Sequence, residues 1–333
     1  MTRAAVARPQ GTATRRPVGG TAVTAGAWAA VAGLAIWALV RLFGLDAWYP
    51  AIQLIAFTPY VAGVAVLVPE VALALRRPRA AVAAGVVAVV LVAFLVPRAA
   101  ADGARLPTGP RLTVMSANLL QGGADPDALL GLVRTHGVDV LALQEYTPGA
   151  DEALHRAGLH LLLPYTSLHA AEGVGGSALY SRWPMRDDGV RMNPWAFGQA
   201  RGALTVPGAP PVAVESVHTC APSSAAATTC WRRSFTNQPP PTVDGPVQLL
   251  IGDFNATLDH APLRHLLGSG YRDAADLVGA GVATTWPYDT LFPRVALDHV
   301  LADRRVGVRR FAVYPVPRSD HRAVVAELVL PAA

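Results

Sequence analysis

Three long apolar stretches near the start of the chain constrain its fold more than any other feature. They cover residues 21–40, 51 to about 75, and 80–96, and the first contains no charged side chain. A helix needs about 20 apolar residues to cross the hydrocarbon core of a bilayer. The pattern therefore predicts three transmembrane helices. The alternatives are a buried helical hairpin in a soluble protein and, for the first stretch, a cleaved signal peptide.

The overall composition agrees with a membrane protein. Hydrophobic residues make up 52% of the chain and charged residues only 15%, whereas roughly 25% of the residues of a soluble protein are charged. The net charge is +5, and the chain contains no lysine. A positive net charge favours binding to a nucleic acid, an acidic lipid or a phosphate substrate. Coding bias towards Ala and Arg explains it equally well.

The distribution of arginines predicts the orientation of the chain in the membrane. The tail and the loop between the second and third stretches are basic, but the loop between the first and second has only Arg41, offset by Asp46. The positive-inside rule places the two basic segments in the cytoplasm, and three crossings leave the rest of the chain outside. Arg98, Arg105 and Arg111 depart from the rule. The basic segments contain Arg3, Arg8, Arg15 and Arg16 in the tail and Arg76, Arg77 and Arg79 in the loop.

These features divide the chain into four parts. We expect a disordered basic cytoplasmic tail at residues 1–20, three transmembrane helices at 21–97, a linker at 98–110, and one soluble domain at 111–333. The linker is rich in small residues, Gly and Pro. The predicted organisation is thus a membrane-anchored domain with its bulk outside the cytoplasm.

The soluble domain alternates strands and helices before strands take over. A helix is predicted over residues 125–136, because Asp125 can cap it, Pro126 suits its first turn and Gly137 ends it. A second helix is expected over 150–157. Such a pattern indicates an α+β fold or a layered α/β sandwich. Strands are expected over 112–117, 138–143, 178–181, 212–217, 247–251, 295–301, 309–316 and 323–330.

The stretch Leu249 to Ala256 is the most informative part of this domain. An apolar strand ends at Gly252, and Asp253 and Asn255 follow one residue apart. Positions i and i+2 of an extended segment face the same way, so a carboxylate and an amide should leave the strand side by side. The carboxylate can bind a metal or accept a proton, and the amide can bind an oxyanion. A plain turn after a strand is the alternative.

Similar polar residues stand at the ends of the other predicted strands. Each has an ordinary explanation by itself, such as a chain reaching solvent or a capped turn. Their repetition at strand ends instead indicates one site held by a rigid scaffold. The residues are Asn118, Gln144, Glu145, His218, Asp298, His299, Asp320 and His321.

With these motifs in order, the chain resembles the endonuclease/exonuclease/phosphatase (DNase I-like) superfamily. The resemblance covers nearly all of residues 111–330, and Gly-Asp-Phe-Asn together with Ser-Asp-His is its most specific part. The motifs are Ser116-Ala117-Asn118, Leu143-Gln144-Glu145, Gly176 to Arg182, Val217-His218-Thr219, Gly252-Asp253-Phe254-Asn255, Leu297-Asp298-His299 and Ser319-Asp320-His321.

The resemblance implies a four-layer α/β (α+β) sandwich and a Mg²⁺-dependent hydrolase of phosphate esters, with Mn²⁺ as an alternative ion. Glu145 looks like the principal metal ligand, assisted by Asn118 and Asp320, which suits a hard ion that keeps several waters. Asp253 looks like the group that positions or deprotonates the attacking water.

The remaining roles also follow from the resemblance. Asn255 and His218 look like donors to phosphate oxygens. His321 is similar to the histidine beside the scissile phosphate, and Asp298 to its carboxylate partner, which would raise the pKa of His321 and fix its tautomer. Leu120 stands where several nucleases of the family carry an acid, which puts a second metal in doubt. The role of His299 stays open, with a structural hydrogen bond favoured.

Residues 219–241 form an insertion after the His218 strand. Cys220 and Cys230 lie in a domain predicted to face an oxidising compartment, so we expect a disulfide between them. Trp231, Arg232 and Arg233 would then line the rim of the site, with arginine for phosphate and tryptophan for an apolar body. A surface loop with reduced cysteines is the alternative.

The predicted anchor narrows the substrate. A lipid phosphate gains from sharing a membrane with its enzyme, because the effective concentration rises. The architecture resembles actinobacterial membrane proteins linked to glycopeptide-antibiotic resistance (VanJ-like), which implies a polyprenyl diphosphate of cell-wall synthesis as substrate. Two alternatives remain. One is an anchored nuclease or sphingomyelinase-like phosphodiesterase, with nucleic acid as its less favoured partner, and the other is a catalytically silent protein that binds a cell-wall partner.

Overall fold

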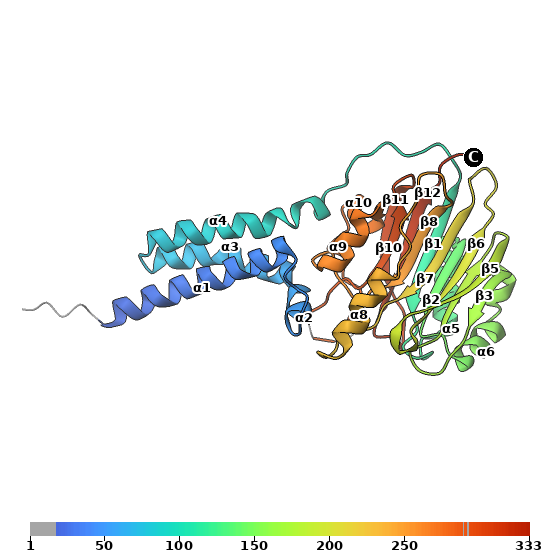
Figure 1. Ribbon diagram of the computed structural model, residues 1–333, viewed down its shortest axis with the longest axis horizontal. Coiled ribbons are helices and arrows are strands. Elements are labelled where there is room, and N and C mark those ends of the chain that lie inside the picture. The colour runs from blue at the N-terminus through green and yellow to red at the C-terminus, as the bar shows by residue number, and fades with distance from the viewer. Residues whose placement is uncertain (1–17, 289, 292) are drawn as a thin grey trace, which may run out of the picture.

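The computed structural model describes residues 18–288, 290–291 and 293–333 of the chain. It consists of an elongated helical bundle and an α/β domain, which meet at one end of the bundle (Figure 1). The basic tail predicted over residues 1–20 lies outside the described residues except for its last three, which begin the first helix.

The bundle is built from three apolar helices. They are α1 (Val18–Phe43), α3 (Thr58–Ala74) and α4 (Pro78–Ala93), with the short α2 (Ala51–Ile55) at the domain-side end. Among the described helices, only Gly20–Phe43 is both long and apolar enough to cross a membrane. The other two are shorter, 17 and 16 residues, because Arg76 turns out of α3 with φ 59° and Pro78 starts α4. One of the three predicted spans therefore meets the length criterion.

The domain contains twelve strands among the described residues. Eight of them lie where the sequence predicts a strand, and the other four were not expected. In chain order the strands are β1 (Arg111–Asn118), β2 (Val140–Gln144), β3 (Tyr165–His169), β4 (Ser177–Ser181), β5 (Met185–Met192), β6 (Gly198–Leu204), β7 (Val212–His218), β8 (Val247–Asp253), β9 (Tyr271–Asp273), β10 (Asp298–Asp303), β11 (Gly307–Pro315) and β12 (Arg322–Val329).

The helices of the domain cover the outer faces of its sheets. They are α5 (Pro126–His136), α6 (Pro148–Ala157), α7 (Leu159–Leu162), α8 (Ala227–Thr236), α9 (Ala261–Gly268) and α10 (Ala274–Leu277), and 3-10 turns occupy Val96–Ala99 and Pro194–Ala196. The predicted caps of α5 are present: the Asp125 side chain accepts from the N–H groups of Asp127 and Ala128, and Gly137 adopts φ 58°.

Two sheets of six strands each, among the described residues, form the centre of the domain. Their strand orders are β11-β12-β1-β2-β4-β3 and β5-β6-β7-β8-β10-β9. Each has one parallel pair at its middle, β1 with β2 and β7 with β8, flanked by antiparallel neighbours. The two sheets thus repeat the same plan, although no repeat is visible in the sequence.

Period-2 alternation divides the strand side chains between two cores. Leu112 and Val114 of β1 face the second sheet and pack with Val214 and Ile251. Met115, on the opposite face of β1, packs beneath α5 and α6. The outer face of the second sheet is covered by α8 and α9 through another core that includes Trp231, Phe235, Leu250 and Leu263. The order helix, sheet, sheet, helix is the predicted four-layer sandwich (Figure 1).

The segment predicted as a linker at residues 98–110 packs on the domain at its start. Arg98 is buried, Ala101 forms a β-bridge with Val278, and the Asp102 N–H donates to the Leu277 carbonyl. The predicted linker thus begins in contact with the domain, because the buried Arg98 side chain finds a carboxylate partner there, Asp259.

Candidate active site

The strand register brings the predicted residues to one edge of the sandwich. Asn118 pairs with Gln144 at the ends of β1 and β2, and His218 pairs with Asp253 at the ends of β7 and β8. Asp298, the first residue of β10, lies opposite Asp253. Because both parallel pairs end at the same edge, side chains more than a hundred residues apart in sequence meet there.

Gly252 allows this approach at the end of β8. A Cβ atom at this position would lie 2.0 Å from the carbonyl oxygen of Val217 on the neighbouring strand. Any side chain would therefore force β7 and β8 apart at the point where His218 and Asp253 leave them. This contact is the physical reason for glycine in the Gly-Asp-Phe-Asn motif.

Glu145 directs its carboxylate into the site from a left-handed backbone conformation, φ 56°. Its Oε1 accepts a hydrogen bond from Nδ2 of Asn118 at 3.1 Å, and its Oε2 accepts from the Gln121 N–H at 2.7 Å. Gln121 and Asn255 also have positive φ, 52° and 45°. For a non-glycine residue, this backbone conformation costs about 1 kcal/mol or more of stability, and such residues are common at functional sites.

Asp253 lies at the centre of the group. Its Oδ2 accepts from Nδ2 of Asn118 at 3.2 Å and lies 3.7 Å from Nε2 of His218 and 3.6 Å from Nε2 of His321. Burial raises the pKa of Asp253, against the opposing influence of the His321 charge. A buried carboxylate in this position is suited to accept a proton.

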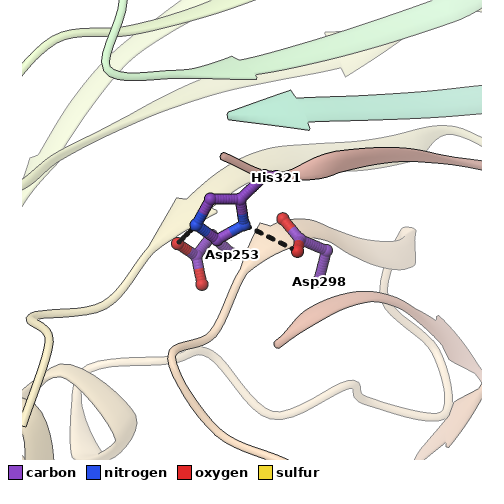
Figure 2. Close-up of side chains that lie close together, drawn as sticks. All are labelled: Asp253, Asp298 and His321. Carbon is purple, nitrogen blue, oxygen red and sulfur yellow. Dashed lines mark hydrogen bonds and ion pairs between the residues drawn. The ribbon is translucent and has the colours of Figure 1, made fainter. Parts of the chain in front are cut away.

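His321 and Asp298 form a hydrogen-bonded pair beside Asp253 (Figure 2). Nδ1 of His321 is 2.9 Å from Oδ2 of Asp298. Burial alone would lower the pKa of His321, but the charges of Asp298 and Asp253 outweigh burial and raise it to about 10. His321 is therefore an imidazolium near neutral pH, with Nδ1–H donated to Asp298 and Nε2–H directed towards Asp253.

His218 differs from His321 in its charge state. Its ring is buried edge-to-face against Phe197, and burial lowers its pKa in spite of the nearby Asp253 charge. Nε2 of His218 lies 3.9 Å from Oε1 of Glu145 as well as near Asp253. The two histidines thus lie on either side of Asp253, one neutral and one protonated.

Asn255 and Asp320 have partners that their predicted roles did not include. The amide Nδ2 of Asn255 donates to the Thr219 carbonyl at 2.9 Å, and the Asn255 N–H donates to Oδ1 of Asp253. Oδ2 of Asp320 accepts from the indole Nε1 of Trp286 at 2.9 Å. Asp320 adds to the raised pKa of His321 rather than joining Glu145 and Asn118 through a direct contact.

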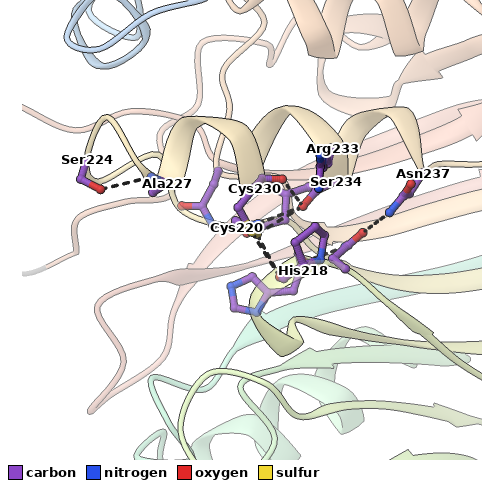
Figure 3. The surroundings of a disulfide bond; sticks show 12 residues. His218, Cys220, Ser224, Ala227, Cys230, Arg233, Ser234 and Asn237 are labelled. Atoms are coloured by element: carbon purple, nitrogen blue, oxygen red, sulfur yellow. Dashed lines mark hydrogen bonds between the residues drawn. A yellow bond between two sulfur atoms is a disulfide. The ribbon is translucent and has the colours of Figure 1, made fainter.

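The predicted substrate rim is wrong for Trp231. This side chain is fully buried beneath the site, and its Nε1 donates to the Asn255 carbonyl at 3.0 Å. Arg232 and Arg233 are exposed, but they line a cleft between α8 and α9. Arg233 lies on the side of α8 away from His218 (Figure 3). The insertion forms the helix α8, so successive residues point in different directions instead of sharing one rim.

The structure contains the disulfide between Cys220 and Cys230, with the Cα atoms 5.8 Å apart. It joins the segment that follows His218 to the middle of α8 (Figure 3). The bridge therefore fixes α8 over the loop that carries Asn255.

His299 has a structural environment. Its Nδ1 is 2.8 Å from Oδ2 of Asp273, and its Nε2 is 2.8 Å from the Ala256 carbonyl. Although burial opposes it, the bond to Asp273 raises the pKa of His299. The ring links β10, the start of α10 and the loop after Asp253.

Sequence reasoning assigned no role to three groups that support the site. Gln144 bridges the sheets, since its Oε1 accepts from Ser116 at 3.1 Å and its Nε2 donates to Ser216 at 2.9 Å. Trp286 holds Asp320, and the Gln121 N–H holds Glu145. The sequence could have indicated a role for Gln144, because this residue belongs to the motif Leu143-Gln144-Glu145. Trp286 and Gln121 belong to no motif, so the sequence contained no indication of theirs.

The donor set beside Glu145 fits a hard divalent cation. The carboxylates of Glu145 and Asp253 converge on the Asn118 amide, whose Nδ2 donates to both while its Oδ1 accepts from the Leu120 N–H. Carboxylate oxygens are ligands that a hard cation prefers. Asp253, Asp298 and His321 also offer ligand atoms within 4.8 Å of one another. The imidazolium of His321 has no lone pair to give, however, so we place the cation on the Glu145 side.

Comparisons with known proteins agree with this geometry. The model of the Endonuclease/Exonuclease/phosphatase family matches residues 115–321. No curated protein matches the chain. A solved structure of a humanised D. rerio TDP2 is similar, at 14% identity, covering 66% of this chain and 98% of that one with a TM-score of 0.51.

Two bacterial structures also align with the domain. They are an endonuclease/exonuclease/phosphatase from Beutenbergia cavernae (18% identity, 66% and 72% of the two chains, TM-score 0.49) and sphingomyelinase C from Streptomyces griseocarneus (19%, 66% and 99%, 0.47). At such identities, likeness to solved structures concerns the fold alone. The family match extends from β1 to His321 and covers well over half of the chain. The protein therefore belongs to the endonuclease/exonuclease/phosphatase family.

Proposed function

We propose that the protein is a metal-dependent phosphohydrolase, anchored in the plasma membrane with its domain outside the cytoplasm, that acts on a lipid phosphate. A polyprenyl diphosphate of cell-wall synthesis is the leading candidate. Family membership supports phosphodiesterase or phosphatase activity. The observation that favours a lipid is that Leu297, next to Asp298, packs with Ala56 at the end of an apolar helical bundle.

The bundle has the side-chain distribution of a membrane protein. Small residues fill its interior, and large apolar residues face outwards, each about half exposed or more. This arrangement is unfavourable in water and favourable in lipid, where close contact between helices is provided by small side chains. The interior residues include Ala62, Ala65, Ala72, Ala84 and Ala88, and the outward residues include Ile36, Leu39, Val64, Leu67, Val71, Val82, Val86 and Val89.

The basic turn of the bundle lies at the end away from the domain (Figure 1). Nη2 of Arg77, between α3 and α4, donates to the Gly20 carbonyl near the start of α1. The positive-inside rule then favours a cytoplasmic location for this end and an external one for the domain.

The domain-side end of the bundle contacts loops that carry the site. Ala56 and Phe57 pack with Trp286, the tryptophan that holds Asp320. The Tyr60 hydroxyl donates to the Arg294 carbonyl at 2.8 Å. In the same loop, Leu291 is fully exposed. With the bundle in a bilayer, these contacts would hold the reacting groups close to the membrane surface, where a lipid headgroup is presented.

The side chains suit in-line hydrolysis of a phosphate ester or anhydride. The bound divalent ion would polarise the phosphoryl group and favour ionisation of water. Asp253 orients the attacking water and accepts its proton. The protonated His321, held by Asp298, donates to a phosphoryl oxygen on which negative charge develops, and neutral His218 can donate a second hydrogen bond. Water adds to phosphorus and the bond to the leaving oxygen breaks. That oxygen takes a proton from solvent, and Asp253 returns the proton of the attacking water to solvent, so the step balances.

Phosphate release by the purified full-length protein tests the proposal. With Mg²⁺ or Mn²⁺, we expect release from a polyprenyl diphosphate in detergent micelles, and a loss of at least a hundredfold in kcat for Glu145→Gln and His321→Ala. Glu152→Gln is the matched control, because it makes the same chemical change on the exposed surface of α6.

The same assay separates the rival substrates. Cleavage of plasmid DNA or of a phosphocholine lipid, with no release from the polyprenyl diphosphate, would favour a nuclease or a sphingomyelinase-like phosphodiesterase. No turnover of any of the three with either ion would contradict the hydrolase assignment itself.

A further inference from the structure

A cleft of about 630 Å³ lies between α8 and α9, apart from the catalytic edge. Both helices cover the outer face of the second sheet, on the side turned towards the bundle (Figure 1). None of the side chains identified above as reacting groups lines it. The lining residues are Thr229, Arg232, Arg233, Phe235, Thr236, Gln238, Pro240, Pro262, His265, Leu266 and Ser269.

The cleft is cationic above an apolar floor. Arg232 and Arg233 are exposed on α8, and His265 faces them from α9. No acidic side chain lines it. Phe235 and Leu266 close its base and belong to the core beneath the helices. Arginine binds phosphate with several directed hydrogen bonds, and an apolar floor accepts hydrocarbon, so the lining matches an amphiphile with an anionic head.

The walls of the cleft are fixed to the structure around it. Cys230 ties α8 to the His218 segment through the disulfide, and Trp231 anchors the helix in the core. The first turn of α9 is fixed to the bundle, because the Ala261 N–H donates to Oδ2 of Asp46 at 3.0 Å. The cleft is thus held in a constant position relative to the end of α1.

We propose that this cleft binds the anionic headgroup of a membrane phospholipid. The inference rests on the proposed membrane anchoring and adds a second lipid site, distinct from the catalytic one. Arg233 lies on the side of α8 opposite His218 (Figure 3), so a lipid held there does not occupy the catalytic centre. Such a lipid would hold the α8–α9 face of the domain against the bilayer.

Lipid binding to the full-length protein in detergent tests this site. Native mass spectrometry with added phosphatidylglycerol or phosphatidylcholine counts the bound molecules. We expect the wild type to retain one phosphatidylglycerol in preference to phosphatidylcholine. Arg232→Gln/Arg233→Gln should weaken this binding about twenty-five-fold, since each arginine near an anionic surface contributes roughly a factor of five. His265→Gln should weaken it less.

The control is Arg309→Gln/Arg310→Gln, an adjacent exposed pair on β11 at the edge of the other sheet. This variant should bind as the wild type does. Equal binding of the two lipids, or unchanged phosphatidylglycerol binding in the α8 double variant, would overturn the proposal. Binding of millimolar inorganic phosphate without retention of phosphatidylglycerol would also overturn it, because the cleft would then be a phosphate site only.

The anchoring is tested separately from the cleft. Extraction of the full-length protein from membranes by alkaline carbonate would contradict the anchor. The measurement in detergent reports on the cleft whether or not the protein hydrolyses any substrate. Failure of the lipid site can therefore be distinguished from failure of the proposed function.

Discussion

At the residue scale, the chemistry depends most directly on the pair His321 and Asp298. Both are buried, and the charge of Asp298 is the main reason that the pKa of His321 rises to about 10 against the effect of burial. Asp298 acts on the proposed reaction through its hydrogen bond to His321, so it is a positioning residue. The histidine needs this partner to stay protonated and to keep its orientation.

We expect Asp298→Asn to lower kcat about a hundredfold and to change KM little. The substitution removes the charge that keeps His321 protonated, so the pKa of His321 falls. As the pH rises, the variant therefore loses the N–H donor of His321 at a lower pH than the wild type does. Steady-state phosphate release measured across pH gives both quantities. The double variant with His321→Ala should be no slower than His321→Ala alone, because the two residues act as a unit. Additive losses would contradict the pair.

At the element scale, α8 is the part of the domain that pattern reasoning placed least well. Its N-cap residue, Ala226, makes no side-chain cap bond, although Oγ of Ser224 accepts from the Ala227 N–H, and the sequence around it reads as a loop. It is stabilised from below, through Trp231 and Phe235, and at its middle by the disulfide. Because Trp231 donates to the Asn255 carbonyl, the helix also supports the catalytic loop.

Loss of the disulfide should destabilise the domain and slow catalysis. For a loop of this length, the bridge contributes about 3 kcal/mol by restricting the unfolded chain. We expect Cys220→Ala/Cys230→Ala to lower the melting temperature by several degrees and kcat several-fold. A thermal melt with and without a reducing agent checks this, because reductant should affect the wild type and leave the double variant unchanged. Equal sensitivity of the two would contradict the role of the bridge.

At the scale of the whole molecule, a buried ionic group joins the bundle to the domain. Nε of Arg41, at the end of α1, lies 2.7 Å from Oδ1 of Asp259, and Arg98 contacts both carboxylate oxygens at 2.7 and 2.9 Å. His260 bonds to the Ile52 carbonyl next to it at 2.8 Å. Arg98 departs from the positive-inside rule, and its partner gives the reason: its charge is neutralised within the protein.

We expect Asp259→Asn to destabilise the full-length protein by about 3–5 kcal/mol, since it leaves buried arginines without their partner. Burial alone would raise the pKa of Asp259, but Arg98 and Arg41 outweigh it and hold the pKa below its usual range. The stabilisation is therefore present above the unfolded pKa of about 3.9 and is lost as pH falls through the folded value.

Thermal melts in detergent between pH 3 and 8 measure this effect. The difference between wild type and variant should stay constant from neutral pH down to about pH 4 and shrink below it. Asp127→Asn, in the first turn of α5, is the control and should differ little at any pH. A difference that grows on acidification would contradict the assigned role of Asp259.

Much of the fold could be predicted because the relevant signals are local. The alternation in β1, the cap at Asp125 and the stop at Gly137 act over a few residues, and the structure has them at the expected positions. The gathering of the strand-end residues also followed, because parallel strands end at a common edge. The strands β3, β5, β6 and β9 were not predicted from the sequence. Strands β3 and β5 are largely exposed or half-buried, β6 contains two glycines, and β9 has only three residues, so their patterns carry little periodicity.

The sequence by itself determined the apolar segments, the principal strands and the chemistry available at their ends. Only the tertiary structure decided that Trp231 supports the site from below, that Arg232 and Arg233 line a different cleft, and that Arg98 pairs with Asp259. Backbone preferences and hydrophobic period extend over a few residues. The direction of a side chain on α8, or a contact across 161 positions, is set by which surfaces pack together.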